Sequence, residues 1–271
     1  MSGGKPRRTV ERATAVTDEE ARRAVSERIV DARIVLASRP DGSEDIWSVL
    51  LDLALVLRPT EWCLIGGQMV AFRAAIVGVP APRTSDDLDV LSNIYLHRDA
   101  VVRCARTVRS LGFEVEEMHT SGHRFTKGRL VIDVLAPDHP PKQSDLRTAG
   151  PRTTIEVPGG TQALQRTEFV SVEHNGREAL VPIPSLLGAL LLKADATRLP
   201  APERHLMDVA FLASLIDDPL KLRTQLTGSD PRRLRTADRQ LADEEHRAWR
   251  SLARDTQRRT YSSWRLLVDG A

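Results

Sequence analysis

The chain has 271 residues, 41% of them apolar and 28% charged, with a formal net charge of only +2. These values are typical of a water-soluble protein with one large or two modest domains, and so small a charge does not indicate a nucleic-acid partner. The sequence shows no long apolar run, no signal peptide and no metal-like spacing of its two cysteines, which predicts a cytoplasmic protein without a membrane span or a disulfide framework.

The N-terminal part of the sequence carries helix signals. A threonine cap and an acidic first turn predict a helix over residues 17–38. A second helix is expected over residues 45–57, because Pro59 disfavours its continuation. We therefore expect residues 1–44 to form an N-terminal helical extension.

The middle of the chain, residues 45–183, mixes strand and helix patterns. Strands are predicted for EWCLIG, DLDVL, FEVEEM, HRFTKG and RLVIDVLA, and helices for GQMVAFRAAIVG and RDAVVRCARTVRSLG. The stretch EFVSVEHNGREALVPI predicts a hairpin that turns at Asn175 and Gly176. This order of elements predicts an α/β core with a mixed sheet.

From residue 184 onward the apolar pattern is helical. Helices are predicted for SLLGALLLKADATRL, APERHLMDVAFLASLI and DPLKLRTQL, followed by one long polar helix over residues 231–259. Residues 184–271 are therefore expected to form a C-terminal helical domain, and the whole chain an α+β fold.

Arginines are frequent in this C-terminal part and admit two interpretations. They stand at positions 232, 233, 235, 239, 247, 250, 254, 258 and 259. Such a run could face phosphates, or it could be the solvated face of helices. Trp249, Tyr261 and Trp264 could stack on bases, but we expect them to close the helical core instead.

Three acids are crowded into the stretch RTSDDLDVL. Because side chains alternate along a strand, Asp87 and Asp89 share one face, with their α-carbons roughly 6.5–7 Å apart. Leu88 and Val90 point to the opposite, buried face, and Asp86 is expected in an exposed turn. Two carboxylates so placed could bind Mg²⁺, which takes oxygen ligands beside substrate phosphates. A chance D-x-D on an exposed turn is the alternative.

A pair of glycines, Gly66 and Gly67, lies where a predicted strand enters a helix in LIGGQMV. Backbone amides at such a junction can approach a phosphate closely, and the helix N-terminus favours negative charge. An ordinary tight turn is the alternative. The pattern is neither G-x-G-x-x-G nor a Walker loop.

Three further charged residues interrupt apolar segments. Asp133 lies inside the strand RLVIDVLAP, where an acid is costly unless it binds a metal or pairs with an arginine. Lys193 interrupts LLGALLLKADA, so it either extends to the surface or reaches an anion. Asp208 interrupts ERHLMDVAFL and could pair with Lys193 or Arg204, or orient Lys193 toward a triphosphate.

In this order the motifs resemble those of the polymerase-β-like nucleotidyltransferase superfamily. They are the strand–helix GG, RTSDDLDV matching R-x-[TS]-x-D-h-D, an h-h-D-h strand, and K-x-D-A followed by R-H-x-x-D. Within the superfamily the chain looks most like the AbiEii/MenT group, the toxins of type IV toxin–antitoxin pairs. The resemblance covers about residues 61–215. One departure is Arg204-His205, where the family often has Lys-Asp.

The resemblance implies a polymerase-β-like core and the Mg²⁺- or Mn²⁺-dependent transfer of a nucleoside monophosphate from an NTP to an acceptor hydroxyl, with release of pyrophosphate. It implies these roles: Gly66 and Gly67 for the phosphates, Asp87 and Asp89 for the metal, Asp133 as third metal ligand or base, Lys193 for the triphosphate, and Asp208 as the late family acid.

The resemblance, together with the basic C-terminal part, also implies RNA as the acceptor, with a tRNA 3′ end as the expected site, and a cognate antitoxin as a protein partner. Two alternatives remain open at this point. The enzyme could modify a small molecule, such as an antibiotic, or a protein. The chain could also be a non-catalytic nucleotide-binding module.

Overall fold

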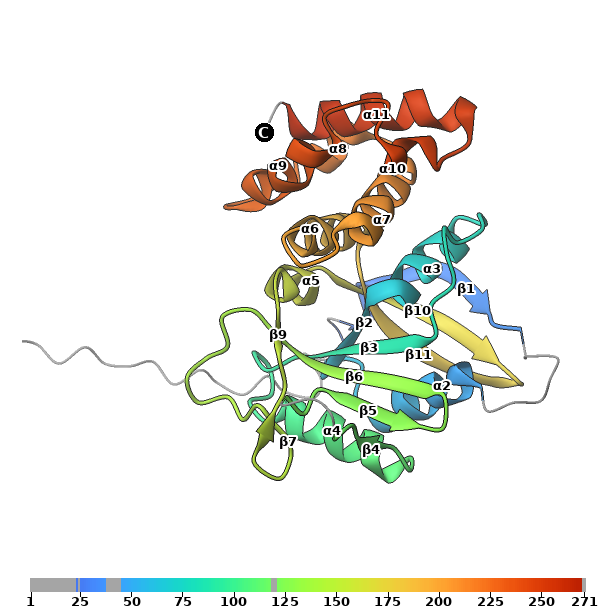
Figure 1. Cartoon of the computed structure of the whole chain (residues 1–271). Coiled ribbons are helices and arrows are strands. Elements are labelled where there is room, and N and C mark those ends of the chain that lie inside the picture. The colour runs from blue at the N-terminus through green and yellow to red at the C-terminus, as the bar shows by residue number, and fades with distance from the viewer. Residues whose placement is uncertain (1–22, 24, 38–44, 118–120, 270–271) are drawn as a thin grey trace, which may run out of the picture.

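The computed structural model describes residues 23, 25–37, 45–117 and 121–269. Within these residues the protein is α+β, with mixed β-sheets and a helical C-terminal region (Figure 1). The strands are β1 (Ile29–Val35), β2 (Trp62–Ile65), β3 (Asp87–Ser92), β4 (Glu114–Val115), β5 (Arg124–Lys127), β6 (Leu130–Pro137), β7 (Arg147–Ala149), β8 (Arg152–Thr153), β9 (Glu156–Val157), β10 (Thr167–His174) and β11 (Arg177–Pro184).

The helices alternate with these strands and then follow them. They are α2 (Ile46–Val56), α3 (Gly66–Ile76), α4 (Ala100–Ser110), α5 (Gly160–Gln165), α6 (Leu186–Ala196), α7 (Glu203–Ser214), α8 (Pro219–Arg223), α9 (Asp230–Leu241), α10 (Arg247–Arg250) and α11 (Arg254–Val268). The predicted helices over 45–57, the two in the core and the first three after residue 184 are confirmed.

The central sheet has the strand order β2-β3-β6-β5-β4, with β9 beside β6. Its pairing is mixed, since β3 and β6 run parallel while β2 and β5 run antiparallel to their neighbours. The register places Asp89 opposite Asp133 on one side and opposite Ile65 on the other. Three segments far apart in the sequence thus meet at one end of β3.

A second sheet has the order β1-β10-β11. Strands β10 and β11 form the expected hairpin, and both Asn175 and Gly176 have positive φ angles, as its tight turn requires. The helix predicted over residues 17–38 is wrong for its last part, because residues 29–35 form β1; most of its first part lies outside the described residues. Strand β1 pairs in parallel with β10 and buries Ile34, a long-range contact that a local helix pattern does not reveal.

The helical region also differs from the expectation at one point. The long helix predicted over residues 231–259 is in fact three helices, α9, α10 and α11. The break is stabilised by His246, whose Nδ1 accepts a hydrogen bond from the first turn of α10, and by Trp249, which is fully buried and donates to the carbonyl of Leu241. Trp249 and Trp264 lie in the core with ring centroids 6.1 Å apart, as expected.

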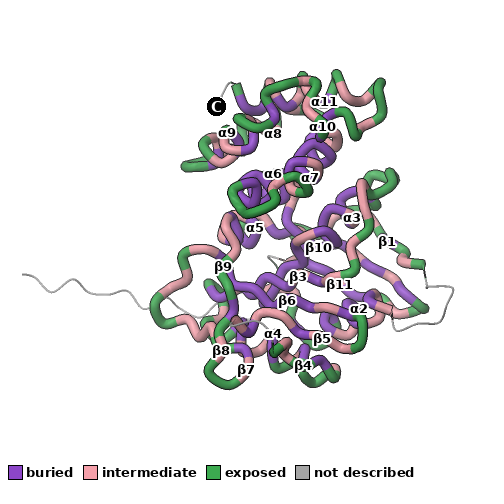
Figure 2. The backbone as a smooth tube through the Cα atoms, viewed as in Figure 1, coloured by how far each residue is buried: buried purple, intermediate pink, exposed green. Residues whose placement is uncertain are grey.

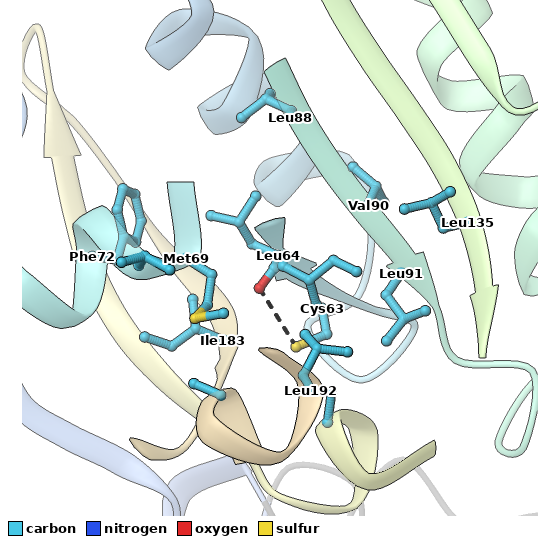
Figure 3. Close-up of a cluster of buried hydrophobic side chains, with 14 of the residues drawn as sticks. Cys63, Leu64, Met69, Phe72, Leu88, Val90, Leu91, Leu135, Ile183 and Leu192 are labelled. Atoms are coloured by element: carbon cyan, nitrogen blue, oxygen red, sulfur yellow. Dashed lines mark hydrogen bonds between the residues drawn. The ribbon is translucent and has the colours of Figure 1, made fainter. Parts of the chain in front are cut away.

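A buried apolar layer joins the sheet to α3 and α6 (Figure 2). Met69 and Phe72 from α3, Ile183 from β11 and Leu192 from α6 pack around Leu64 of β2 (Figure 3). Burying a side chain of this size contributes about 1.5–3 kcal/mol, so the layer holds both helices firmly against the sheet. Among the described residues, no helix is both long and apolar enough to cross a membrane.

Candidate active site

Asp87 and Asp89 lie in the N-terminal half of β3 and share one face of the strand, as strand alternation predicts. Leu88 and Val90 have no exposed surface and point to the other side of the sheet, whereas both acids are partly accessible. Among the described residues, neither carboxylate accepts a hydrogen bond. Asp86 precedes the strand and is exposed, as expected. Two carboxylates without hydrogen-bond donors therefore share one open face.

The two glycines are found at the predicted junction, because β2 ends at Ile65 and α3 begins at Gly66. Gly66 has a φ of +72°, and a Cβ built on it would lie 1.6 Å from Oδ2 of Asp89. A Cβ on Gly67 would lie 2.5 Å from Oγ of Ser85. Close packing against Asp89 and Ser85 thus requires glycine at both positions, whatever the glycines bind.

Asp133 lies in the middle of β6 and is buried. Its carboxylate accepts two hydrogen bonds from Arg124, at 2.9 Å from Nε and 2.8 Å from Nη2. The arginine pair that the sequence left open as an alternative is therefore the arrangement in this structure. Arg124 itself was missed, although the predicted strands HRFTKG and RLVIDVLA follow one another directly: if they pair around a turn at Gly128, Arg124 lies opposite Asp133, as the structure shows.

Lys193 and Asp208 form a buried ion pair between α6 and α7. The ammonium of Lys193 lies 2.7 Å from Oδ2 of Asp208, and the two side chains are 5% and 0% exposed. Arg83 donates to both oxygens of the same carboxylate, at 3.1 Å from Nε and 3.0 Å from Nη2. Of the two partners that the sequence left open for Asp208, Lys193 and Arg204, the structure shows Lys193. The sequence missed Arg83 as a further partner, although it stands first in the RTSDDLD motif.

Electrostatic effects show that the predicted site residues lie together. The pKa of Asp89 is raised to about 6, chiefly by burial; Asp133 and Asp87 also act to raise it, while Lys193 and Arg124 act to lower it. Burial also raises the pKa of Asp87, although Arg124 acts in the opposite direction. Asp87, Asp89, Asp133 and Lys193 therefore lie close enough to one another to interact electrostatically.

The pKa of Asp208 is shifted in the opposite direction to the pKa values of Asp87 and Asp89. Burial alone would raise the pKa of Asp208, but Lys193 and Arg83 more than offset it, and the pKa lies below its ordinary value. Burial, with Lys193 and Arg204, lowers the pKa of His205 to about 4. Asp208 is hence an ionised anchor for two cations, and His205 is neutral near pH 7.

Of the three predicted metal ligands, only Asp87 and Asp89 are arranged to bind a divalent cation as the structure stands. Magnesium usually takes one or two carboxylates and completes its ligands with water and substrate phosphates. Asp87 and Asp89, both free of hydrogen-bond donors among the described residues, match that pattern. Asp133 would first have to leave Arg124, and within the described chain no three acidic, histidine or cysteine side chains are grouped to hold a metal by themselves. Asp133 as a third ligand remains a prediction.

The chain matches no protein-family model. Comparisons with curated proteins and with solved structures also find no significant match.

Proposed function

We propose that this protein is an Mg²⁺-dependent nucleotidyltransferase with a polymerase-β-like core. The observation that supports this most directly is the contact of Asp89 with the Gly66 turn, with Asp87 on the same face of β3, Asp133 beside it in β6, and the Lys193–Asp208 pair close enough for Lys193 to act on Asp89. A site of this kind sets acids for a metal against cations for a triphosphate. The order of the same residues along the chain resembles that of the superfamily.

In this proposal the chain divides the work between two groups of residues. Asp87 and Asp89 would hold the metal, which when bound supplies charge stabilisation at the reacting phosphate. The first turn of α3 and the cations around Asp208 would orient the triphosphate, since helix N-termini and charged donors both favour anions. Asp133 would accept the proton of the incoming hydroxyl once Arg124 moves aside.

We propose RNA, with a tRNA 3′ end as the target, as the acceptor. Arg204, an exposed arginine at the start of α7, lies close enough to Asp87 to act against the rise of its pKa. Beside it Arg247 of α10 pairs with Glu203, at 3.7 Å, and both side chains are exposed. Further exposed arginines continue along α10 and α11, and a polyanionic acceptor would gain from such a surface. The role of a toxin with a cognate antitoxin rests on the family resemblance alone.

The proposal is tested by incubating the purified chain with each α-labelled NTP, Mg²⁺ and total tRNA. We expect label at RNA 3′ ends and release of pyrophosphate with the wild type. The double variant Asp87→Asn, Asp89→Asn should lose both, while Asp86→Asn, a change of the exposed neighbouring acid, should retain them.

Each other outcome has a defined meaning. If no NTP yields label or pyrophosphate with tRNA, small hydroxyl compounds or proteins, or if the label persists in the double variant, the nucleotidyltransferase proposal is wrong. If pyrophosphate forms only with a small hydroxyl compound or a protein, the chemistry stands and RNA is wrong as the acceptor.

A further inference from the structure

Arg83 connects the two sides of the site. It lies in the segment between α3 and β3, and its Nε and Nη2 atoms donate to the buried carboxylate of Asp208. The remaining nitrogen, Nη1, donates no hydrogen bond to any residue that the structure describes. One third of the side chain is exposed, at 33%. The guanidinium thus has one edge fixed and one nitrogen open.

The open nitrogen lies at the glycine turn. A Cβ built on Gly67 would be 3.1 Å from Nη1 of Arg83, so this atom stands beside the first turn of α3. Helix α3 has no side-chain cap at its N-terminus. Backbone amides at a helix start and a guanidinium both favour phosphate oxygens, and the planar guanidinium matches their geometry.

Charge and exposure favour Arg83 over Lys193 as the residue that binds an additional anion. Asp208 carries one negative charge and is bound by two cations, so the group retains one positive charge. Lys193 is only 5% exposed and its ammonium is bound to Asp208. Arg83 is the more exposed of the two, and its free nitrogen points toward the turn where the phosphates would lie.

We propose that Arg83 binds the triphosphate of the nucleotide substrate through Nη1, while Asp208 holds the other edge of its guanidinium. The inference rests on the proposed function, because it assigns the substrate of that site. Asp208 is then a positioning residue, which orients Arg83 and Lys193 without touching the nucleotide.

Inorganic tripolyphosphate is a suitable probe, because it carries the charges of the substrate without base or sugar. Its affinity would be measured by calorimetry for the full-length wild type, Arg83→Gln, Arg83→Lys and the control Arg109→Gln, an exposed arginine on α4. Arg83→Gln should weaken binding about ten- to a hundredfold, the range for losing one hydrogen bond between charged groups. Arg109→Gln should bind as the wild type does.

The lysine variant keeps the test decisive if Arg83→Gln does not fold. An ammonium can replace one hydrogen bond to Asp208 but cannot also extend to Gly67, so the affinity should still fall severalfold. With NTP as substrate, the KM should rise in parallel with the tripolyphosphate Kd, whereas kcat should change less. A purely structural role would lower the melting temperature without this parallel rise.

Wild-type tripolyphosphate affinity in the folded Arg83 variants would overturn the inference. The results that would refute the proposed function differ from those that would refute the role of Arg83. If the wild type transfers nucleotides in an Asp87-dependent way but Arg83 variants bind normally, only the role of Arg83 is wrong. If tripolyphosphate binding depends on Arg83 but no transfer occurs, the anion site stands and the nucleotidyltransferase proposal is wrong.

Discussion

Lys193 and Asp208 form an ion pair with 2.7 Å between Nζ and Oδ2, and the aspartate side chain has no exposed surface. The pair joins α6 to α7, so it stabilises the helical side of the site as well as orienting its charges. Removing one partner of a buried pair leaves the other charge without compensation, which is far more costly than losing a surface ion pair.

Asp208→Ala should therefore lower the free energy of unfolding by about 3–5 kcal/mol. Asp217→Ala, at an exposed position after α7, should change it little. Urea unfolding at pH 7 measures both variants. Because the folded-state pKa of Asp208 lies below its ordinary value, its stabilising contribution is present above about pH 4 and is lost as the pH falls further. Equal urea midpoints for the two variants would contradict the structural role of the pair.

Gly66→Ala tests the close approach of Asp89. The added Cβ would collide with Oδ2 of Asp89, at 1.6 Å. The alanine would also have to keep the positive φ of Gly66, which is unfavourable for a residue with a side chain. Gly78→Ala is a matched control, because Gly78 has a similar φ of +70° but no atom within 4 Å of a built Cβ. We expect Gly78→Ala to cost about 1–2 kcal/mol through the backbone alone.

Gly66→Ala should destabilise the protein by clearly more than Gly78→Ala and should abolish nucleotide transfer. Thermal unfolding and the labelling assay measure the two effects. The double variant Gly66→Ala, Asp89→Ala should recover part of the stability but none of the activity. Equal melting temperatures for the two glycine variants would show that Asp89 does not pack against Gly66.

The raised pKa of Asp89 predicts a pH-dependent stability. With a folded-state pKa of about 6 against an ordinary value of 3.8, the folded protein binds this proton more tightly than the unfolded chain does. Ionised Asp89 therefore destabilises the metal-free protein fully above about pH 6, and this effect disappears as the pH falls toward 4.

Asp89→Asn removes the ionisation and should raise the melting temperature at pH 7.5 in the presence of a chelator. The gain over the wild type should shrink between pH 6 and 4. Asp86→Asn, which changes an exposed acid, serves as the control. A lower melting temperature of Asp89→Asn at pH 7.5 would contradict the electrostatic argument.

The cysteines should be unreactive in the folded protein. Cys63 and Cys104 are both buried and free, and burial raises the pKa of each thiol to about 12. A thiol reagent acts on the thiolate, so neither residue should react at pH 8 until denaturant is added. Spectrophotometric titration with an aromatic disulfide reagent measures this. Rapid reaction of one thiol in buffer would place it nearer the surface.

The sequence predicted much of the site because strand alternation is a local property. The shared face of Asp87 and Asp89, and the glycine junction before α3, follow from patterns within a few residues. The pairing of β3 with β6 joins distant segments, so local periodicity could not show that Asp89 stands opposite Asp133. Arg124 was nevertheless within reach, because a hairpin register follows from its turn.

The two errors in secondary structure have a common physical cause. Residues 29–35 carry a pattern compatible with a helix, yet they form β1 because β10 offers a parallel partner. The long polar helix is interrupted because burial of Trp249, with its hydrogen bond to Leu241, turns the chain. In both places a contact made only in the folded protein outweighs the local preference.

The contact between Gly66 and Asp89 has a consequence for relatives of this chain. The space that a side chain at position 66 would need is already filled by the carboxylate at position 89. In a family of sequences with this fold, the two positions should therefore covary. A chain that gains a side chain at the first should have lost the acid at the second, and with it one of the two proposed metal ligands. One glycine in an alignment would then distinguish members that keep the proposed chemistry from members that have lost it.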